Sequence, residues 1–191
     1  MDMYLTTKKP KFKKFFKSLL FWVIEIIFVI LAAYLIIEYA LEKTTMMGIS
    51  MNTTLNEGDK IIINKMAYIK KEPQRNDVIV FSQSKTGHGY YNIKRVIGLP
   101  GETVEIINGE VYIDGTRLQE VIPTEAMRVA GLADKVILLG ENEFFVLGDN
   151  RNYSEDSRFA NIGMIVRNDI IGKAWLRLEP FSIIDKINRE D

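Results

Sequence analysis

Hydrophobic residues form one long run near the start of the chain. From Leu19 to Ala40 the only charged residues are Glu25 and Glu38. A helix needs about 20 mostly apolar residues to cross a bilayer, so the run predicts one transmembrane anchor over residues 18–40. Bulky side chains continue to the end of the run, which favours a retained anchor over a cleaved secretory signal. We interpret Glu25 as a charge tolerated near the cytoplasmic interface.

After the anchor, the pattern changes to short β-branched runs bounded by turn residues. Asn108-Gly109 and Asp114-Gly115 are strong signals for tight hairpins, because both turn positions favour positive φ. Residues 120–135 have weak periodicity and predict an excursion or a short helix. The predicted strands cover residues 60–64, 77–81, 92–97, 103–107, 110–113, 116–118, 143–147 and 169–178. Strands and helices do not alternate, so residues 41–191 predict one mainly β, mostly antiparallel domain instead of a doubly wound sheet.

The distribution of charge predicts how the anchor is oriented in the membrane. The 191 residues carry 25 basic and 25 acidic side chains, so no net charge attracts the chain to nucleic acid. Six lysines and a single acidic residue, Asp2, precede the apolar run. The lysines are Lys8, Lys9, Lys11, Lys13, Lys14 and Lys17. This excess predicts a basic cytoplasmic tail over residues 1–17 and an extracytoplasmic domain over 41–191. The absence of cysteine excludes disulfides and thiol chemistry.

Ser50 and Lys94 are the candidate nucleophile and base. Ser50 lies about ten residues after the anchor, and Gly48 before it leaves room for a substrate backbone. Lys94 lies in an apolar β-branched run, where burial would favour loss of its proton near neutral pH. With one histidine, His88, and no cysteine, a serine–lysine pair is the simplest hydrolytic arrangement with a side-chain nucleophile. The alternatives are an inert loop serine and a solvent-facing strand lysine.

The residues beside Lys94 indicate which face of the predicted strand each charged side chain would occupy. In a strand, Lys94 would share one face with Asn92 and Val96, whereas Arg95 would point to the other face. At least one of the two cations is therefore expected to face inward or to lie at an edge.

A polar loop follows the apolar strand predicted over residues 143–147. Asp149 and Asp156 in this loop can pair with Arg95 or with arginines of the loop itself, Arg151 and Arg158. A calcium loop is the alternative, but interleaved arginines would repel the cation, and the glycine of the common calcium loop is missing. We favour a structural polar network around a reactive site.

Four separated blocks of the sequence resemble the type I signal peptidases, which are membrane-anchored serine–lysine endopeptidases. The blocks run from Gly48 to Leu55, from Gly58 to Lys65, from Ile93 to Glu102 and from Gly148 to Arg158. Their order and spacing are similar to those of the short Gram-positive-type enzymes. The resemblance implies a signal-peptidase-like antiparallel β domain behind one transmembrane helix.

The resemblance also implies residue roles. Ser50 would be the nucleophile, Lys94 the general base, and Ser154 the serine that hydrogen-bonds and orients the lysine amine. The Ser50 backbone amide would hold the oxyanion, and Gly48 stands where some relatives have a serine hydroxyl as a second donor. The structural ion-pair loop would consist of Asp149, Arg151, Asp156 and Arg158, with Arg95 as the partner of Asp149. Two positions depart from the family pattern: Thr53 replaces a proline, and Asn92 replaces a tyrosine.

The implied activity is removal of signal peptides from exported preproteins through an acyl-enzyme on Ser50. Small residues are expected at the first and third positions before the cleaved bond, in pockets formed near Ser50 and by residues 77–81. The expected partners are preproteins and the lipid bilayer, and the resemblance leaves room for association with the secretion machinery. No metal or cofactor is expected, and the protein would be a single-pass protein of the cell membrane.

Three other functions use some of the same features. A self-cleaving protease related to repressors would share the serine–lysine chemistry, but it would be soluble. A non-hydrolytic relative that assists assembly of surface polymers such as pili would typically lack the serine or the lysine. A plain anchored binding module would leave Lys94, Ser154 and the loop at 148–158 unexplained.

Overall fold

The computed structural model describes residues 11–82 and 91–187, and of residues 11–13 the backbone only. His88 and the first ten residues of the predicted basic tail lie outside this range. The chain divides into two compact units, Met1–Ala40 and Leu41–Asp191.

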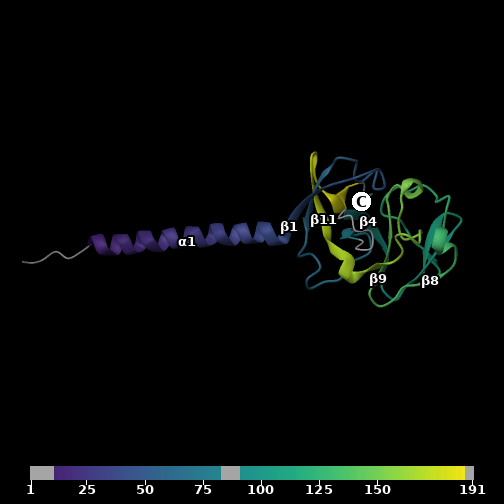
Figure 1. Cartoon of the computed structure of the whole chain (residues 1–191), viewed down its shortest axis with the longest axis horizontal. Coiled ribbons are helices and arrows are strands. Elements are labelled where there is room, and N and C mark those ends of the chain that lie inside the picture. The colour runs from purple at the N-terminus through teal and green to yellow at the C-terminus, as the bar shows by residue number, and fades with distance from the viewer. Residues whose placement is uncertain (1–10, 83–90, 188–191) are drawn as a thin grey trace, which may run out of the picture. The chain divides into compact units, whose positions relative to one another are not determined.

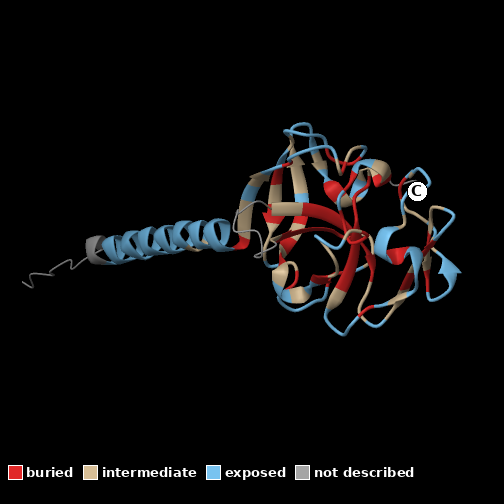
Figure 2. Ribbon diagram, turned by 45° about the vertical axis from the view of Figure 1, so that its right-hand side comes forward, coloured by how far each residue is buried: buried red, intermediate tan, exposed pale blue. Residues whose placement is uncertain are grey.

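The first unit contains one helix, α1 (Lys11–Ala40). Within it, Lys14–Ala40 contains an 18-residue window with a mean hydropathy of 2.8 and is long and apolar enough to cross a membrane. Its large apolar side chains are exposed along the helix (Figure 2). In water such a helix would expose apolar surface on every side, and a bilayer removes that cost. The helix begins seven residues before the predicted anchor, because the basic residues before position 18 continue it.

The second unit is built from two antiparallel sheets (Figure 1). The larger sheet has eight strands in the order β1-β2-β11-β3-β4-β9-β10, with β12 paired to β11. Its strands are β1 (Leu41–Thr45), β2 (Lys60–Asn64), β3 (Val78–Ser82), β4 (Tyr91–Gly98), β9 (Glu143–Leu147), β10 (Ile165–Val166), β11 (Ile170–Leu178) and β12 (Phe181–Ile183). The smaller sheet has the order β7-β6-β5-β8 and consists of β5 (Thr103–Ile107), β6 (Glu110–Ile113), β7 (Thr116–Arg117) and β8 (Ile137–Leu138).

The predicted hairpins are confirmed. Asn108 and Gly109 both have positive φ, 53° and 81°, and they turn β5 back onto β6. Asp114 and Gly115, with φ of 49° and 74°, do the same between β6 and β7. The region from 120 to 135 is an excursion, as predicted, and its regular structure is the short 3₁₀ helix η2 (Gly131–Asp134).

The centre of the larger sheet is buried on both faces. In β3, Val78 and Val80 join one hydrophobic cluster with Ile93, whereas Ile79 and Phe81 join another with Val96. A third cluster connects the end of β4 and β9 to the smaller sheet. Strand β4 lies between β3 and β9, so both of its neighbours and both of its faces are protein. Lys94 is 5% exposed and Arg95 is 1% exposed, so both cations are buried, where the alternation pattern required only one.

Candidate active site

Ser50 lies in a tight turn between β1 and β2. The Asn52 amide donates to the Ile49 carbonyl (3.1 Å), and the Leu55 amide donates to the Met51 carbonyl (2.8 Å). Met51 and Leu55 are fully buried in the core, whereas Ser50 is half-buried. The side chains of Met51 and Leu55 therefore anchor the turn in the core, and Ser50 lies closer to the surface of the domain.

Lys94 reaches Ser50 from β4. Its Nζ lies 2.8 Å from Ser50 Oγ, at hydrogen-bond distance, although 44 residues separate the two in sequence. Burial lowers the pKa of Lys94, and the negative charges of Asp156, Glu155 and Asp149 oppose this by a smaller amount. The structure thus brings together the predicted nucleophile and base, and the lysine is in an environment that favours its neutral form.

Arg95, the next residue in β4, is held by a buried ion pair. Its Nε and Nη2 donate to the two carboxylate oxygens of Asp149 at 2.8 and 2.7 Å. The side chains are 2% and 0% exposed. Nη2 also lies 3.3 Å from Thr54 Oγ1, and Nη1 donates to the Asn76 carbonyl at 2.9 Å. The predicted pairing of Arg95 with Asp149 is confirmed and connects β4 to the loop after β9, whereas the Thr54 contact connects β4 to the turn that carries Ser50.

The loop from Gly148 to Arg158 contains a second buried ion pair. Arg158 donates to both oxygens of Asp156 at 2.8 and 2.9 Å, and Asp156 Oδ2 accepts from the Gly148 amide at 3.1 Å. Arg151 binds Glu120 of the excursion, and not an aspartate of its own loop as the sequence suggested. Glu120 is a member of this network that sequence reasoning missed.

The calcium alternative has no support in this loop. Asp149 and Asp156 each use both carboxylate oxygens on an arginine. Across the described ranges 11–82 and 91–187, no group of three or more histidine, cysteine, aspartate or glutamate residues could hold a metal ion. The loop is a network of arginine–carboxylate pairs.

Ser154 does not make the hydrogen bond that the resemblance implied. Its Oγ is buried and has no hydrogen-bond partner among the described residues, so it is not bonded to Lys94. Ser154 instead packs against Gly148. A Cβ on Gly148 would overlap Ser154 Oγ and would come within 2.5 Å of the Ser50 carbonyl oxygen. Ser154 therefore lies beside residues 49–55, which we call the nucleophile segment. Gly148 is the residue that allows this close packing.

Gly48 and Thr53 flank Ser50 with unusual backbone angles. Gly48 has φ of 73°, and its amide donates to Glu57 Oε1 at 3.3 Å. Thr53 has φ of 84°, which a proline ring cannot adopt because it fixes φ near −65°. The replacement of the family proline by Thr53 therefore accompanies a backbone that excludes proline. Asn92 pairs with Phe81 in the β3–β4 ladder, beside the base.

Comparison with known proteins identifies the family of the chain. The sequence profile of the family described as "Signal peptidase, peptidase S26" matches residues 19–179. The chain belongs to this signal peptidase family.

Among its relatives, signal peptidase I of Bacillus licheniformis is 33% identical over 95% of this chain and 99% of its own length. Signal peptidase IB of Staphylococcus aureus is 30% identical over 87% of this chain and 92% of its own. Probable signal peptidase I-1 of Synechocystis is 41% identical over 70% of this chain and 68% of its own. A crystal structure of a signal peptidase I from Enterococcus faecalis V583 is 32% identical and covers 54% of this chain and 97% of that chain, with a TM-score of 0.42.

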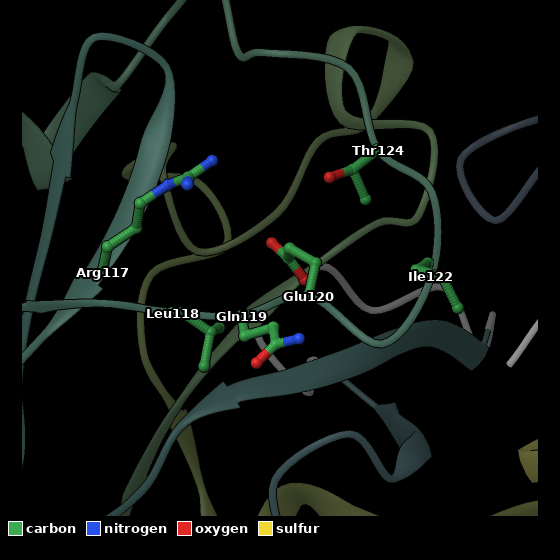
Figure 3. A pocket seen from close by; sticks show the side chains of 6 residues that line it. All are labelled: Arg117, Leu118, Gln119, Glu120, Ile122 and Thr124. Carbon is green, nitrogen blue, oxygen red and sulfur yellow. The ribbon is translucent and has the colours of Figure 1, made fainter. Parts of the chain in front are cut away.

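A hollow of about 510 Å³ lies in the excursion after β7 and is lined by polar and aliphatic side chains (Figure 3). Its lining residues are Arg117, Leu118, Gln119, Glu120, Ile122 and Thr124. A smaller hollow of about 90 Å³ includes Thr53 and Asn150 and so borders the turn that carries Ser50.

We expect the Arg95–Asp149 pair to be essential for folding. Arg95→Met or Asp149→Leu alone should destabilise the domain by about 3–5 kcal/mol, because each leaves an unpaired buried charge. The double variant should lose less than the sum of the two, since neither charge then remains. Chemical denaturation of all three variants measures this coupling, and strictly additive losses would contradict the assignment.

Gly148→Ala should impair activity through the nucleophile. The new Cβ would push against the Ser50 carbonyl, and a displacement of about 1 Å at a reacting group can cost 100-fold in rate. The matched control is Gly140→Ala, where the Cβ meets only the end of the flexible Glu143 side chain. Cleavage rates of the two variants give the comparison, and equal rates would show that Gly148 has no such role.

Proposed function

We propose that this signal peptidase is a membrane-bound serine endopeptidase that removes N-terminal signal peptides with Ser50 as nucleophile and Lys94 as general base. The observation that carries the proposal is the 2.8 Å contact between Lys94 Nζ and Ser50 Oγ, inside a domain that lowers the pKa of the lysine. A serine hydroxyl becomes an effective nucleophile only when an adjacent base accepts its proton.

The reaction follows from the properties of the pair. Neutral Lys94 takes the proton of Ser50 Oγ as the oxygen attacks the carbonyl carbon of the cleaved bond. The Ser50 backbone amide stabilises the oxyanion, and Lys94 then passes the proton to the leaving amine of the mature protein. A water molecule, deprotonated by Lys94, then attacks the ester carbonyl. Lys94 returns the proton to Ser50 Oγ as the ester bond breaks, which releases the signal peptide with a free carboxylate and restores the serine. Nucleophile and base supply this chemistry, so the proposal invokes no metal or cofactor.

The ion-pair network has a defined electrostatic part in this mechanism. Asp149 and Asp156 would hold a proton on Lys94 if their charges were free. Each is instead neutralised by a bidentate arginine, Arg95 or Arg158. Desolvation can then dominate the pKa of the lysine. We assign Arg95, Asp149, Asp156 and Arg158 as supporting residues on this ground. Arg151 joins this set because it connects the loop to Glu120 of the excursion.

Gly48 and Ser154 complete the supporting set. Gly48 occupies the position before the nucleophile segment with a left-handed φ, and it offers no side-chain donor to the oxyanion. Ser154 lies beside the Ser50 carbonyl through its packing on Gly148.

The proposed substrate is the extended cleavage region of a preprotein with small residues at the first and third positions before the cut. Residues near Ser50 and strand β3 would form shallow pockets that exclude larger side chains. An extended peptide could bind by adding a strand beside the site, with main-chain hydrogen bonds supplying affinity. Recognition of small residues, contact with lipid and association with the secretion machinery are parts of this proposal.

The orientation in the membrane is likewise proposed from sequence. The lysine-rich tail favours a cytoplasmic N-terminus and an extracytoplasmic domain. About ten residues connect Ala40 to Ser50, and a chain of that length spans at most roughly 35 Å. We propose that the nucleophile acts near the membrane face, where a signal peptide leaves the bilayer. No relative described above carries the name of a pilus assembly factor, and no observation favours that alternative.

The first experiment uses the full-length protein in detergent with a preprotein that carries an Ala-x-Ala cleavage region. Wild type should cut after that motif, and Ser50→Ala or Lys94→Met should reduce the rate at least about 1,000-fold, since nucleophile and base act as a unit. Lys43→Met, on an exposed position of β1, is the control and should leave the rate unchanged. N-terminal sequencing of the product identifies the cut, and persistent cleavage by Ser50→Ala would exclude the proposed nucleophile.

The pH dependence should report the ionisation of Lys94. Only the neutral amine accepts the serine proton, so kcat/KM should rise with pH through the pKa of Lys94, which is lowered below 10.5. Glu155 raises that pKa, so Glu155→Gln should move the rising limb to lower pH. Glu105→Gln, in β5, is the control and should leave it in place. An unchanged profile for Glu155→Gln would mean that another group controls the limb.

A further inference from the structure

Asn150 holds two consecutive carbonyl groups of the nucleophile segment. Its backbone amide donates to the Ser50 carbonyl at 3.0 Å, and its side-chain Nδ2 donates to the Ile49 carbonyl at 3.1 Å. Both contacts join residues about 100 positions apart in sequence. A single residue of the loop from Gly148 to Arg158 thus fixes the peptide units on both sides of the Ser50 Cα.

The backbone of Asn150 explains how one residue makes both contacts. Its φ and ψ are −81° and 75°, and the Arg151 amide donates to the Asp149 carbonyl at 3.0 Å. These are the features of an inverse γ-turn centred on Asn150. The flanking ion pairs of Asp149 with Arg95 and of Arg151 with Glu120 hold the turn from both sides. Asn150 is therefore presented to the nucleophile segment from a fixed support.

Peptide geometry turns the Ile49 contact into a constraint on the Ser50 amide. The Ile49 carbonyl and the Ser50 N–H belong to one planar peptide unit, which is trans, so the two groups point in opposite directions. Anchoring the carbonyl oxygen to Asn150 Nδ2 and to the Asn52 amide sets the direction of that N–H. Among the described residues, the Ser50 N–H donates no hydrogen bond, so it is available to a ligand.

We infer that Asn150 is a positioning residue of the oxyanion hole, whose side-chain amide aims the Ser50 N–H at the oxygen that becomes negatively charged during peptide-bond attack. The inference rests on the proposed function, in which that N–H stabilises the oxyanion. The Ser50 N–H is more important here than in relatives with a serine hydroxyl as second donor, because Gly48 carries no side-chain donor. A preorganised donor is effective only when its direction is fixed before the reaction.

Removal of the Asn150 side chain should change the direction of the Ser50 N–H more than the stability of the fold. In Asn150→Ala the backbone contact to the Ser50 carbonyl and the Asn52 contact to the Ile49 carbonyl both remain. The Ser50 N–H is then loosened but not removed. Complete loss of an oxyanion donor costs about 100- to 1,000-fold in kcat, so we expect a fall of roughly 10- to 100-fold, with KM nearly unchanged. Asn150→Asp should lose more, because a carboxylate oxygen would face the Ile49 carbonyl oxygen.

Asn152 provides a matched control in the same loop. Its Oδ1 accepts from the Arg128 amide at 2.9 Å, and its Nδ2 donates to Glu125 and to the Ala126 carbonyl, both at 3.2 Å. Its side chain therefore makes three hydrogen bonds where that of Asn150 makes one, but these join the loop to the excursion and not to Ser50. Asn152→Ala should lower the melting temperature at least as much as Asn150→Ala and should keep the wild-type kcat.

The experiment measures kcat, KM, melting temperature and affinity for a peptide aldehyde in full-length wild type, Asn150→Ala, Asn150→Asp and Asn152→Ala. Ser50 Oγ adds to the aldehyde carbon, its proton moves to Lys94, and the resulting alkoxide occupies the oxyanion position. If the inference is correct, aldehyde affinity and kcat fall by similar factors in the Asn150 variants, while the pH of the rising limb stays unchanged.

Three results would overturn the inference. One is a kcat for Asn150→Ala within twofold of wild type. Another is a fall in kcat without a fall in aldehyde affinity, since the defect would then lie outside the oxyanion position. The third is an activity loss that parallels melting temperature in both the Asn150 and Asn152 variants. A wild-type protein that cleaves no preprotein would instead refute the proposed function, and the inference would fall with it.

Discussion

The buried pair between Arg95 and Asp149 is the interaction on which the candidate site depends. Arg95 follows the base in β4, and Asp149 begins the loop that contacts the nucleophile segment. The same guanidinium reaches the Thr54 hydroxyl and the Asn76 carbonyl. Three chain segments distant in sequence are thereby fixed around one planar cation, whose five donors have a rigid geometry. Lysine at position 95 could not hold all of these partners in a defined plane.

This arrangement also explains how a buried lysine can lie in a highly charged region without an ion-pair partner among the described residues. Acidic side chains are present nearby, yet no carboxylate lies within ion-pair distance of Lys94 in the part of the chain that the structure describes. The aspartates pair with arginines and not with Lys94, because a guanidinium binds both carboxylate oxygens at once. The domain thus separates two kinds of cation: guanidiniums paired with carboxylates, and a buried amine, Lys94, whose pKa is lowered by desolvation.

Local features of the sequence predicted the local features of the structure. β-branched runs located most strands within a residue, and Asn108-Gly109 located its hairpin, because both depend on neighbouring residues alone. Strand alternation could not place both cations of β4 inside, since a central strand with two covered faces gives no polar face to read. The Arg151–Glu120 pair was missed because it joins a loop to a distant excursion. Asn150 was missed because one of its two hydrogen bonds to the nucleophile segment is made by its backbone amide, which every residue except proline carries.

The separation of Ser50 and Lys94 along the chain has a consequence for when the enzyme becomes active. The two side chains meet only after a turn, a central strand and the loop following β9 have docked, across a gap of 44 residues. Closing such distant contacts belongs to the late, cooperative part of folding. On the proposed function, a newly synthesised, still extended chain contains both reactive groups but no assembled Ser50–Lys94 pair. Proteolytic activity would then be acquired together with the native sheet.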